Sequence, residues 1–311
     1  MIKVNNDSTV SVVLCTRNGI AFINEQLKSL EAQTYKNIQV ICSDNNSSDG
    51  TDEVLRNWCS HHDARIFVCQ EEPGLNKNFF HALNFATGKY VIFCDQDDVW
   101  FSEKIKRLVA FIETHEEASM VYCLSKPFYG ELPKDAAIKK MNWLEGTEVR
   151  KTLLTSFTLG HNMLLRKSVL DKIKLPATET VAYDWWITVN AMCIAPIYCL
   201  PEVLTFWRQH HSNTTTQLNT GLYYKLRISY LRTFEQIPIL NNAQRNWIQQ
   251  AIQAFEQLET KSFSISLFFF LLVHRDFVFF FKNKKTFLDK LISGIKWSWR
   301  MSHADFRIDR K

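Results

Sequence analysis

Short apolar runs alternate with amphipathic stretches through the first half of the chain. The apolar runs are rich in β-branched residues and predict buried strands at 10–15, 38–42, 65–69, 89–94 and 119–123. Between them apolar residues recur at helical spacing, as at Ile23, Leu27 and Leu30, and predict helices near 23–30, 48–59, 77–86 and 103–114. Strands that alternate with helices in this way indicate an α/β fold, a mostly parallel sheet with helices on both faces.

The pattern changes along the second half of the chain. Residues 125–145 show no regular spacing, and a strand at 158–166, a helix at 183–193 and a strand at 203–207 follow. From about residue 221 helical spacing dominates, over 223–235 and 243–259. We therefore expect an α/β domain over residues 1–215 and a helical C-terminal extension over residues 216–311.

Composition excludes bulk disorder, because 46% of the 311 residues are hydrophobic and 13% are aromatic. The charge is uneven. Residues 260–311 hold eleven Lys or Arg and four acids, a net charge of +7, so with +5 for the whole chain the first 259 residues carry −2. A basic tail on a near-neutral body predicts contact with an anionic surface, either nucleic acid or anionic lipid.

The eight cysteines form no Cys-x-x-Cys pair, and most lie in or beside apolar runs. This placement is typical of small buried side chains in a reducing compartment rather than of a metal or redox site. The N-terminus has no apolar core after a basic start, so it does not predict a secretory signal. We expect a cytoplasmic protein.

Polar segments follow several of the predicted strands, at 16–19, 43–49 and 95–98. Ligands of parallel sheets bind beyond the carboxyl ends of the strands, where these segments are expected to converge. The segment 95–98 places three carboxylates in four residues. Like charges so close repel one another, and Mg²⁺ commonly joins one or two carboxylates to substrate phosphates. The segment predicts a metal-diphosphate site, with a solvated acidic turn or helix cap as the alternative.

Four motifs together resemble those of glycosyltransferase family 2: 12–19, 44–51, 74–79 and 93–100, in the family's order and at fitting separations. The Asp-Gln-Asp-Asp-Val-Trp form at 95–100 is similar to the bacterial rhamnosyltransferase-like branch. The resemblance covers roughly residues 8–215. It implies a GT-A fold, a nucleotide-diphosphate sugar donor, a divalent metal, Mg²⁺ or Mn²⁺, and inversion at the anomeric carbon.

The resemblance also implies roles for particular residues. Asp184 corresponds to the catalytic base, and an inverting transfer needs one such base to take the acceptor hydroxyl proton. Asp97 and His210 correspond to metal ligands; Asn45 stands where many members have a second Asp. The residues expected at the nucleotide-sugar are Thr16, Arg17, Asp44, Asn45, Lys77, Asn78, Asp95, Gln96 and Arg208. Those expected at the acceptor are Asp98, His161, Trp185 and Trp186. For Asp184 and His161 an ordinary helix cap and a satisfied buried imidazole are the alternatives.

The tail holds eight of the 23 phenylalanines between residues 263 and 281. Only twelve uncharged residues separate Lys261 from His274, which is too short for a membrane-spanning helix. Leu288, Leu291, Ile292, Ile295 and Trp299 then recur on one helical face among Lys284, Lys285, Lys290, Lys296 and Arg300. This pattern predicts a helix in the plane of an anionic inner-membrane surface, with packing on the catalytic domain or in a homodimer as the alternative. No recognised nucleic-acid module accompanies the basic residues, so no nucleic-acid partner is expected.

The leading hypothesis is an inverting hexosyl- or deoxyhexosyltransferase of bacterial surface polysaccharide biosynthesis, that is, of capsule, O-antigen or lipooligosaccharide. Its expected partners are a dTDP-rhamnose or UDP-hexose donor and a lipid-linked or oligosaccharide acceptor. A sugar-phosphate nucleotidyltransferase would need a Gly-rich basic loop after the first strand, and residues 16–19 do not supply it. The remaining alternative is a non-catalytic nucleotide-sugar-binding or scaffold protein of the same pathway.

Overall fold

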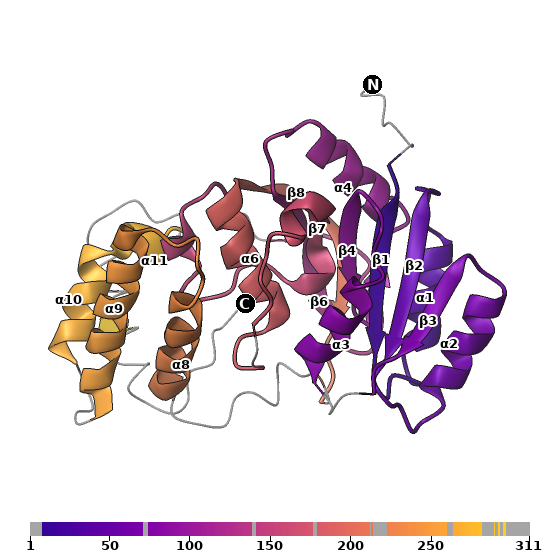
Figure 1. Cartoon of the computed structure of the whole chain (residues 1–311), viewed down its shortest axis with the longest axis horizontal. Helices are drawn as coiled ribbons and strands as arrows, with labels where there is room; N and C mark the ends of the chain where they lie inside the picture. The colour runs from indigo at the N-terminus through magenta and orange to yellow at the C-terminus, as the bar shows by residue number, and fades with distance from the viewer. Residues whose placement is uncertain are drawn as a thin grey trace. The chain divides into compact units, whose positions relative to one another are not determined.

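The computed structural model describes residues 8–70, 74–138, 141–176, 179–211, 213, 223–259, 264–281, 289, 292, 295 and 296. The chain divides into two compact units (Figure 1). The first comprises Met1–Lys139, Glu145–Thr147 and Thr158–His210. The second comprises Lys140–Leu144, Glu148–Phe157 and His211–Lys311, so two short segments expected in the α/β domain belong to the helical unit.

The first unit is built on an eight-stranded sheet with the order β3-β2-β1-β4-β7-β6-β8-β5. The strands are β1 Val10–Thr16, β2 Ile38–Asp44, β3 Ala64–Val68, β4 Tyr90–Cys94, β5 Val99–Trp100, β6 Met120–Phe128, β7 Met163–Arg166 and β8 Ile197–Arg208. Only β7 and β5 run against the other six, since β7 pairs antiparallel with β4 and β6, and β5 pairs antiparallel with β8. The expected α/β fold with a mostly parallel sheet is therefore confirmed.

Helices cover both faces of this sheet. They are α1 Ile23–Glu31, α2 Thr51–Ser60, α3 Leu75–Leu83, α4 Lys104–Glu113, α5 Lys167–Leu170 and α6 Tyr183–Ile194, with a short 3-10 helix η2 at Gly160–Asn162. Helices α1, α2 and α4 share a hydrophobic core with Val12 and Leu14 of β1. On the opposite face, Phe93 of β4 contacts the rings of Phe79 in α3 and Tyr183 in α6, at centroid distances of 5.7 and 5.1 Å.

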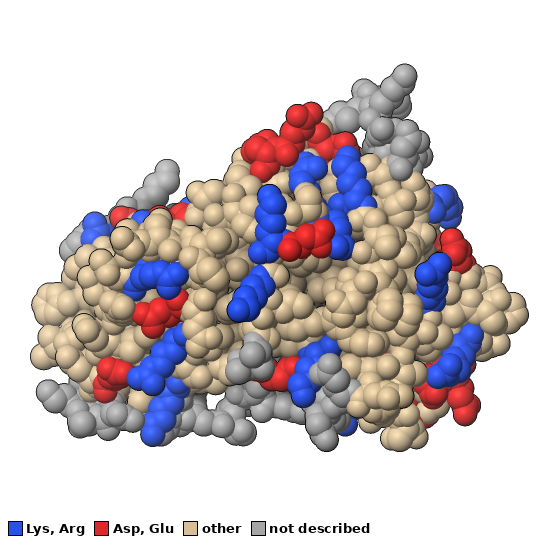
Figure 2. Space-filling model, viewed as in Figure 1, with Lys and Arg blue, Asp and Glu red and all other residues tan. Residues whose placement is uncertain are grey.

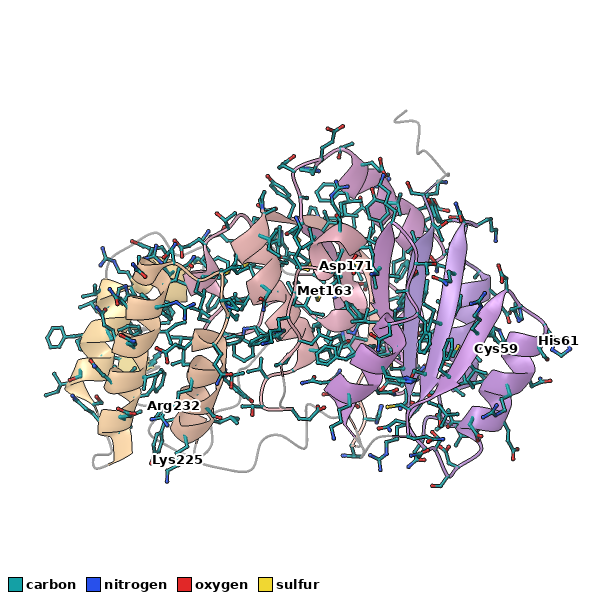
Figure 3. All side chains as sticks on the ribbon, in the orientation of Figure 1. Cys59, His61, Met163, Asp171, Lys225 and Arg232 are labelled. Carbon is teal, nitrogen blue, oxygen red and sulfur yellow. The ribbon has the colours of Figure 1, made fainter. Side chains whose placement is uncertain are left out.

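Side chains fill the space between the sheet and its helices, as Figure 3 shows around Met163 of β7, which is fully buried. All eight cysteines are free thiols, and six of them are buried. Cys59 of α2 faces the sheet, with its Sγ 3.8 Å from Cys42 Sγ. The thiols thus behave as the small core side chains that their placement in the sequence predicts.

The predicted strand at 158–166 is half wrong. Gly160–Asn162 form the 3-10 helix η2, and the strand begins only at Met163. The backbone N–H of Gly160 donates a hydrogen bond to the carboxylate of Asp184 on α6, at 3.2 Å, so it does not pair in the sheet. The strand β6 also continues to Phe128, where irregular structure was expected, because β8 pairs along it.

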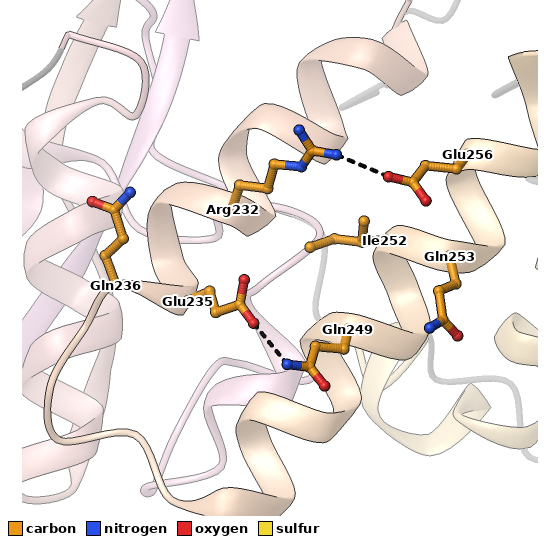
Figure 4. Close-up of a pocket in the computed structure, with 7 residues that line it drawn as sticks. All are labelled: Arg232, Glu235, Gln236, Gln249, Ile252, Gln253 and Glu256. Carbon is orange, nitrogen blue, oxygen red and sulfur yellow. Dashed lines mark hydrogen bonds and ion pairs between the residues drawn. The ribbon is translucent and has the colours of Figure 1, made fainter.

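The second unit is helical, with α8 Tyr223–Glu235, α9 Asn242–Glu256, α10 Ile265–Val273 and α11 Arg275–Val278, and short 3-10 helices η1 Val149–Lys151 and η3 Gln257–Glu259. Trp247 of α9 packs against Phe270 of α10, with ring centroids 5.1 Å apart. A polar groove between α8 and α9 is bridged by Arg232 with Glu256 and by Gln249 with Glu235, at 2.9 and 3.0 Å (Figure 4).

Of the helices in the described ranges, none is both long enough and apolar enough to cross a membrane. The basic amphipathic segment expected around 284–300 lies outside the described residues, apart from 289, 292, 295 and 296. On the face in view in Figure 2, Lys and Arg side chains lie beside Asp and Glu side chains.

Candidate active site

The loops after β1 and β2 are fixed by the carboxylate of Asp44, which is almost fully buried. It accepts hydrogen bonds from Thr16 Oγ1 at 2.7 Å, from Ser47 Oγ at 2.6 Å and from the Ser47 backbone N–H at 2.8 Å. Asp44 therefore lies at the strand end where a nucleoside contact was expected. Its oxygens organise the loop after β2.

The loop after β1 is joined to the acidic turn after β4 by a pair of hydrogen bonds. The Arg17 backbone N–H donates to Gln96 Oε1 at 2.9 Å, and Gln96 Nε2 donates to the Arg17 carbonyl at 3.0 Å. A Cβ at Gly19 would lie only 2.3 Å from Gln96 Oε1, so a side chain there would displace the Gln96 amide from its two bonds to Arg17. The expected convergence of the segments 16–19 and 95–98 is confirmed.

Two buried amides brace the neighbouring loops. Asn78 of α3 donates to the Thr16 carbonyl at 3.1 Å and accepts from Ser43 Oγ at 2.7 Å. Asn45 donates to the Cys69 carbonyl at 2.9 Å and accepts from the Gly74 N–H at 3.2 Å. These contacts tie β1, β2 and α3 together. Lys77, by contrast, is only half-buried on the first turn of α3.

The acidic turn 95–98 meets the end of β8 because β5 follows the turn directly and pairs with β8. His210 Nε2 lies 2.8 Å from Asp97 Oδ2, which brings the two expected metal ligands together. Burial and the nearby charge of Asp95 raise the pKa of Asp97, although His210 opposes the shift. A cation at this carboxylate would offset the same repulsion.

A second set of metal-compatible donors lies beside the first. Asp95, Asp98 and His161 place one donor atom each within 4.8 Å of one another. His161 Nδ1 is 3.1 Å from Asp95 Oδ2 and 3.0 Å from Asp98 Oδ2. Among the described residues, the buried His161 Nε2 has no hydrogen-bond partner. Carboxylate oxygens with one imidazole suit Mg²⁺ or Mn²⁺, so the residues of the turn fit a divalent metal.

The two sets differ in access. The side chains of Asp97 and His210 are 16% and 18% exposed, and those of Asp98 and His161 are 0% and 2% exposed, but Asp95 of the second set is 33% exposed. An ion that also binds a diphosphate must remain open to the substrate. Asp97, His210 and Asp95 meet this condition, whereas Asp98 and His161 are buried.

Sequence reasoning missed Lys104, a fully buried lysine on the first turn of α4. Its Nζ donates to the His161 carbonyl at 2.6 Å and to Thr205 Oγ1 at 2.7 Å, and it lies 3.6 Å from the centre of the Trp100 ring. Burial lowers the pKa of Lys104 to about 8 and raises that of Asp98 to about 7. The signal in the sequence was its position four residues before Leu108 and eight before Ile112, on the core face of α4.

Arg208, expected at the donor diphosphate, is held by the protein itself. Its backbone N–H donates to Asp98 Oδ1 at 3.1 Å, and its Nε donates to the Asp97 carbonyl at 2.9 Å. The guanidinium also pairs with Glu25 of α1 and lies between the rings of Phe22 and Phe128. Arg208 therefore clamps the acidic turn in this conformation.

Asp184 lies on the first turn of α6. Its Oδ2 accepts from the Gly160 N–H at 3.2 Å, and its Oδ1 accepts from the Trp185 N–H at 2.7 Å. Burial raises the pKa of Asp184 to about 6, and the charge of Asp95 adds to the shift. Because η2 carries both Gly160 and His161, the carboxylate of Asp184 and the acidic turn meet the same short segment.

The aromatic residues expected at the acceptor are buried instead. Trp185 and Trp186 retain 6% and 4% of their exposure, and Trp186 Nε1 donates to the Lys174 carbonyl at 3.0 Å. Helix α6 is apolar on nearly every side, which is typical of a helix buried all round. Both rings therefore pack in the protein interior, and a contact of Trp185 or Trp186 with the acceptor stays a prediction.

Known proteins share this sequence pattern. A family model for glycosyl transferase family 2 matches residues 11–174, more than half of the chain. The chain is 25% identical over 205 residues to an uncharacterized protein of Mycobacterium tuberculosis, covering 65% of this chain and 59% of the relative. It is 33% identical over 147 residues to the GalNAc(5)-diNAcBac-PP-undecaprenol beta-1,3-glucosyltransferase of Campylobacter jejuni, covering 43% of this chain and 47% of that enzyme. The matches span less than two thirds of the length of these relatives.

Solved structures share the fold at low sequence identity. The structure is similar to S. aureus TarS in complex with UDP-GlcNAc, with a TM-score of 0.61 and 19% identity over 87% of this chain and 81% of that one. It is also similar to the mannosyltransferase PcManGT from Pyrobaculum calidifontis in complex with GDP-Man and Mn²⁺, with a TM-score of 0.54 and 15% identity over 98% and 86%. The fold is thus of the GT-A type, as expected. With its ordered motifs and the match over residues 11–174, the chain belongs to glycosyl transferase family 2.

Proposed function

We propose that this protein is an inverting glycosyltransferase that moves a sugar from a nucleotide-diphosphate donor to a hydroxyl of a glycan acceptor. The observation that carries the proposal is the meeting of two acidic groups at η2. Asp184 accepts from Gly160, while the carboxylates of Asp95 and Asp98 lie at 3.1 and 3.0 Å from His161 of the same segment.

In the proposed reaction Asp184 acts as the general base. Its carboxylate removes the proton of the acceptor hydroxyl as that oxygen forms a bond to the anomeric carbon. The bond between the anomeric carbon and the diphosphate oxygen breaks, and the nucleoside diphosphate leaves with the electron pair. The raised pKa of Asp184, about 6, keeps the group ionised at neutral pH yet basic enough to accept a proton.

The other residues hold the reactants. Asp44, Asn45 and Asn78 shape the loops expected around the nucleoside, and Lys77 is available to a phosphate from the first turn of α3. Asp97 and His210 would hold the divalent metal, which supplies positive charge to the departing diphosphate when it is bound.

We infer the finer identity from chemistry and likeness. The Campylobacter relative is named for a polyprenol-linked glycan, and TarS was solved with UDP-GlcNAc. These names support a lipid-linked or oligosaccharide acceptor in surface polysaccharide biosynthesis. They also support a UDP-hexose donor, and the form of the acidic motif supports dTDP-rhamnose as the second candidate.

The test separates binding from transfer. The purified protein is titrated calorimetrically with UDP and dTDP, each with and without Mn²⁺, and turnover is followed by release of the nucleoside diphosphate from UDP-hexoses and dTDP-rhamnose. We expect Asp97→Ala to abolish the effect of Mn²⁺ on nucleotide affinity. Asp184→Asn should keep that affinity and lose transfer. Wild-type transfer by the Asp184→Asn variant would show that another residue is the base.

We also propose that the helical unit places the enzyme on an anionic inner-membrane surface. Ile265, Phe269 and Val273 occupy successive turns of one face of α10 and are 65%, 55% and 67% exposed. Residues 260–311, which include this helix, carry the net charge of +7. An apolar stripe within a basic segment is the composition that binds the interface of anionic bilayers.

Vesicle co-sedimentation tests this placement. The full chain should pellet with vesicles of phosphatidylglycerol and not with vesicles of phosphatidylcholine, and Phe269→Asp should release it. Ile239→Asp changes a residue of similar exposure, 48%, outside α10 and should leave binding unchanged. Equal binding of both variants and the wild type would refute a role for the α10 stripe.

A further inference from the structure

Asn76 of α3 connects that helix to the start of α6, although the two positions are more than a hundred residues apart in sequence. Its Oδ1 accepts from the Tyr183 backbone N–H at 2.7 Å, and its Nδ2 donates to the Val181 carbonyl at 2.8 Å. The first N–H groups of a helix lack partners within the helix. The buried side chain of Asn76, which belongs to α3, supplies the acceptor for one of these N–H groups, that of Tyr183.

Glu179 fixes the segment that leads into α6. Its carboxylate accepts from the backbone N–H groups of Asn76 and Lys77, each at 3.0 Å, at the N-terminus of α3. A Cβ at Gly74 would lie 2.7 Å from Glu179 Oε1, so a side chain there would push the carboxylate aside. The carboxylate also complements the positive end of the helix dipole.

Tyr183 completes the connection on the side facing the sheet. Its ring stacks on Phe79 of α3, with centroids 4.0 Å apart, and its hydroxyl lies against Gly160. The next residue, Asp184, then accepts from the Gly160 N–H. The direction of the Asp184 carboxylate is therefore set by three elements, α3, α6 and η2.

We propose that Asn76 is a positioning residue for Asp184, and that α3 holds the base and the nucleotide loops in one fixed arrangement. The inference rests on the proposed function, since it takes Asp184 as the base. It follows because α3 also carries Asn78, which is bonded to the loops after β1 and β2. A displacement of about 1 Å of a catalytic group can cost on the order of a hundredfold in rate.

Variants of Asn76 test the proposal through the division between kcat and KM. Asn76→Ala removes both contacts and should lower kcat roughly ten- to hundredfold, with the donor KM and nucleotide affinity within about twofold of the wild type. Asn76→Asp keeps the acceptor for the Tyr183 N–H and loses the donor to Val181. It should recover part of the lost kcat.

Gln33 offers a matched control. Its buried amide accepts from the Ile105 N–H at the start of α4, at 3.2 Å, and donates to the Phe101 and Ser29 carbonyls at 2.9 and 3.0 Å, so it makes the same kinds of contact at another helix. Gln33→Ala should therefore destabilise the fold to a similar degree and leave kcat within about twofold. Equal losses of kcat in Asn76→Ala and Gln33→Ala would overturn the positioning role and indicate general destabilisation.

Amide hydrogen exchange separates this inference from the proposed function. In Asn76→Ala, peptides covering 181–188 should exchange at least tenfold faster, whereas the same peptides in Gln33→Ala should match the wild type. If exchange is faster in Asn76→Ala but the wild-type protein transfers no sugar from any donor, the connection between α3 and α6 stands and the proposed function is refuted. Unchanged exchange and unchanged kcat in an active enzyme would refute the connection alone.

Discussion

Replacing Gly160 by alanine places a single methyl group at the most crowded point beside the candidate base. An ideal Cβ there would lie 1.9 Å from the Tyr183 hydroxyl oxygen, 2.6 Å from Cζ and 3.0 Å from Cε2. The tyrosine ring has little room to retreat, because it is buried and stacked on Phe79. The Gly160 backbone is held as well, by its hydrogen bond to Asp184.

The expected cost follows from this crowding. Extra methylenes in packed cores typically cost about 1–3 kcal/mol, and contacts this short place Gly160→Ala at the upper end. For a domain of this size each kcal/mol lowers Tm by roughly 2–4 °C, so the variant should melt about 6–12 °C lower. The rate of transfer should fall by more than the loss of folded protein accounts for, because the Gly160 N–H that donates to Asp184 moves with the backbone.

A double-mutant cycle measured by urea unfolding checks the cause. Tyr183→Leu removes the ring atoms that the new methyl group would strike, so in that background Gly160→Ala should cost less than about 1 kcal/mol. The coupling energy between the two positions should then be about 2 kcal/mol. An alanine variant as stable as the wild type, or one whose cost is the same in both backgrounds, would refute the packing described at η2.

Three other predictions concern titration and capping. Asp184 must be ionised to accept a proton, and its pKa is about 6. The value of kcat/KM should therefore fall tenfold per pH unit below about pH 6. A flat pH profile of kcat/KM down to pH 5 would contradict the role of Asp184 as base. The pKa of Asp98 is raised to about 7, so in the folded protein this group binds a proton that it releases in the unfolded chain. Its contribution to the unfolding free energy should fall as pH rises from about 4 to 7, and Asp98→Asn should remove that contribution in denaturant titrations. Asn241 and Gln244 form a capping box at the start of α9. Asn241→Ala should therefore lower the unfolding free energy by about 1 kcal/mol, measured by chemical unfolding. An equal loss in Asn242→Ala, at its exposed neighbour, would argue against the cap.

The sequence predicted the parts of the fold that depend on local pattern. Strands β1, β2 and β4 and helices α1 and α8 lie where the pattern placed them, because the strands are mostly apolar runs and the helices carry apolar residues at helical spacing. The antiparallel insertion of β7 between β4 and β6 was not predicted. Neighbouring strands in sequence usually pair, and nothing in the residues 163–166 signals the reversed direction.

The candidate site was predicted to the extent that it lies in strand-end motifs. The acidic turn could be named because it directly follows an apolar strand, whereas His210 and Asp184 could be named only through the resemblance to the family's motifs. Asn76 and Glu179 could not, since their partners lie about a hundred residues away and no local pattern pairs them. The burial of Trp185 follows from the apolar pattern of the whole helix α6, which two aromatic residues beside an acid do not reveal by themselves.

The position of β7 has a consequence for the order in which the chain can fold during synthesis. Strand β4 emerges from the ribosome with one edge open, and its partner across that edge pairs Tyr90 with Arg166, 76 residues later. Contacts between such distant residues form slowly, and an unpaired strand edge is a template for association with other chains. A nascent or truncated chain that stops before residue 163 should therefore be prone to aggregation, and extension through residue 166 should relieve it.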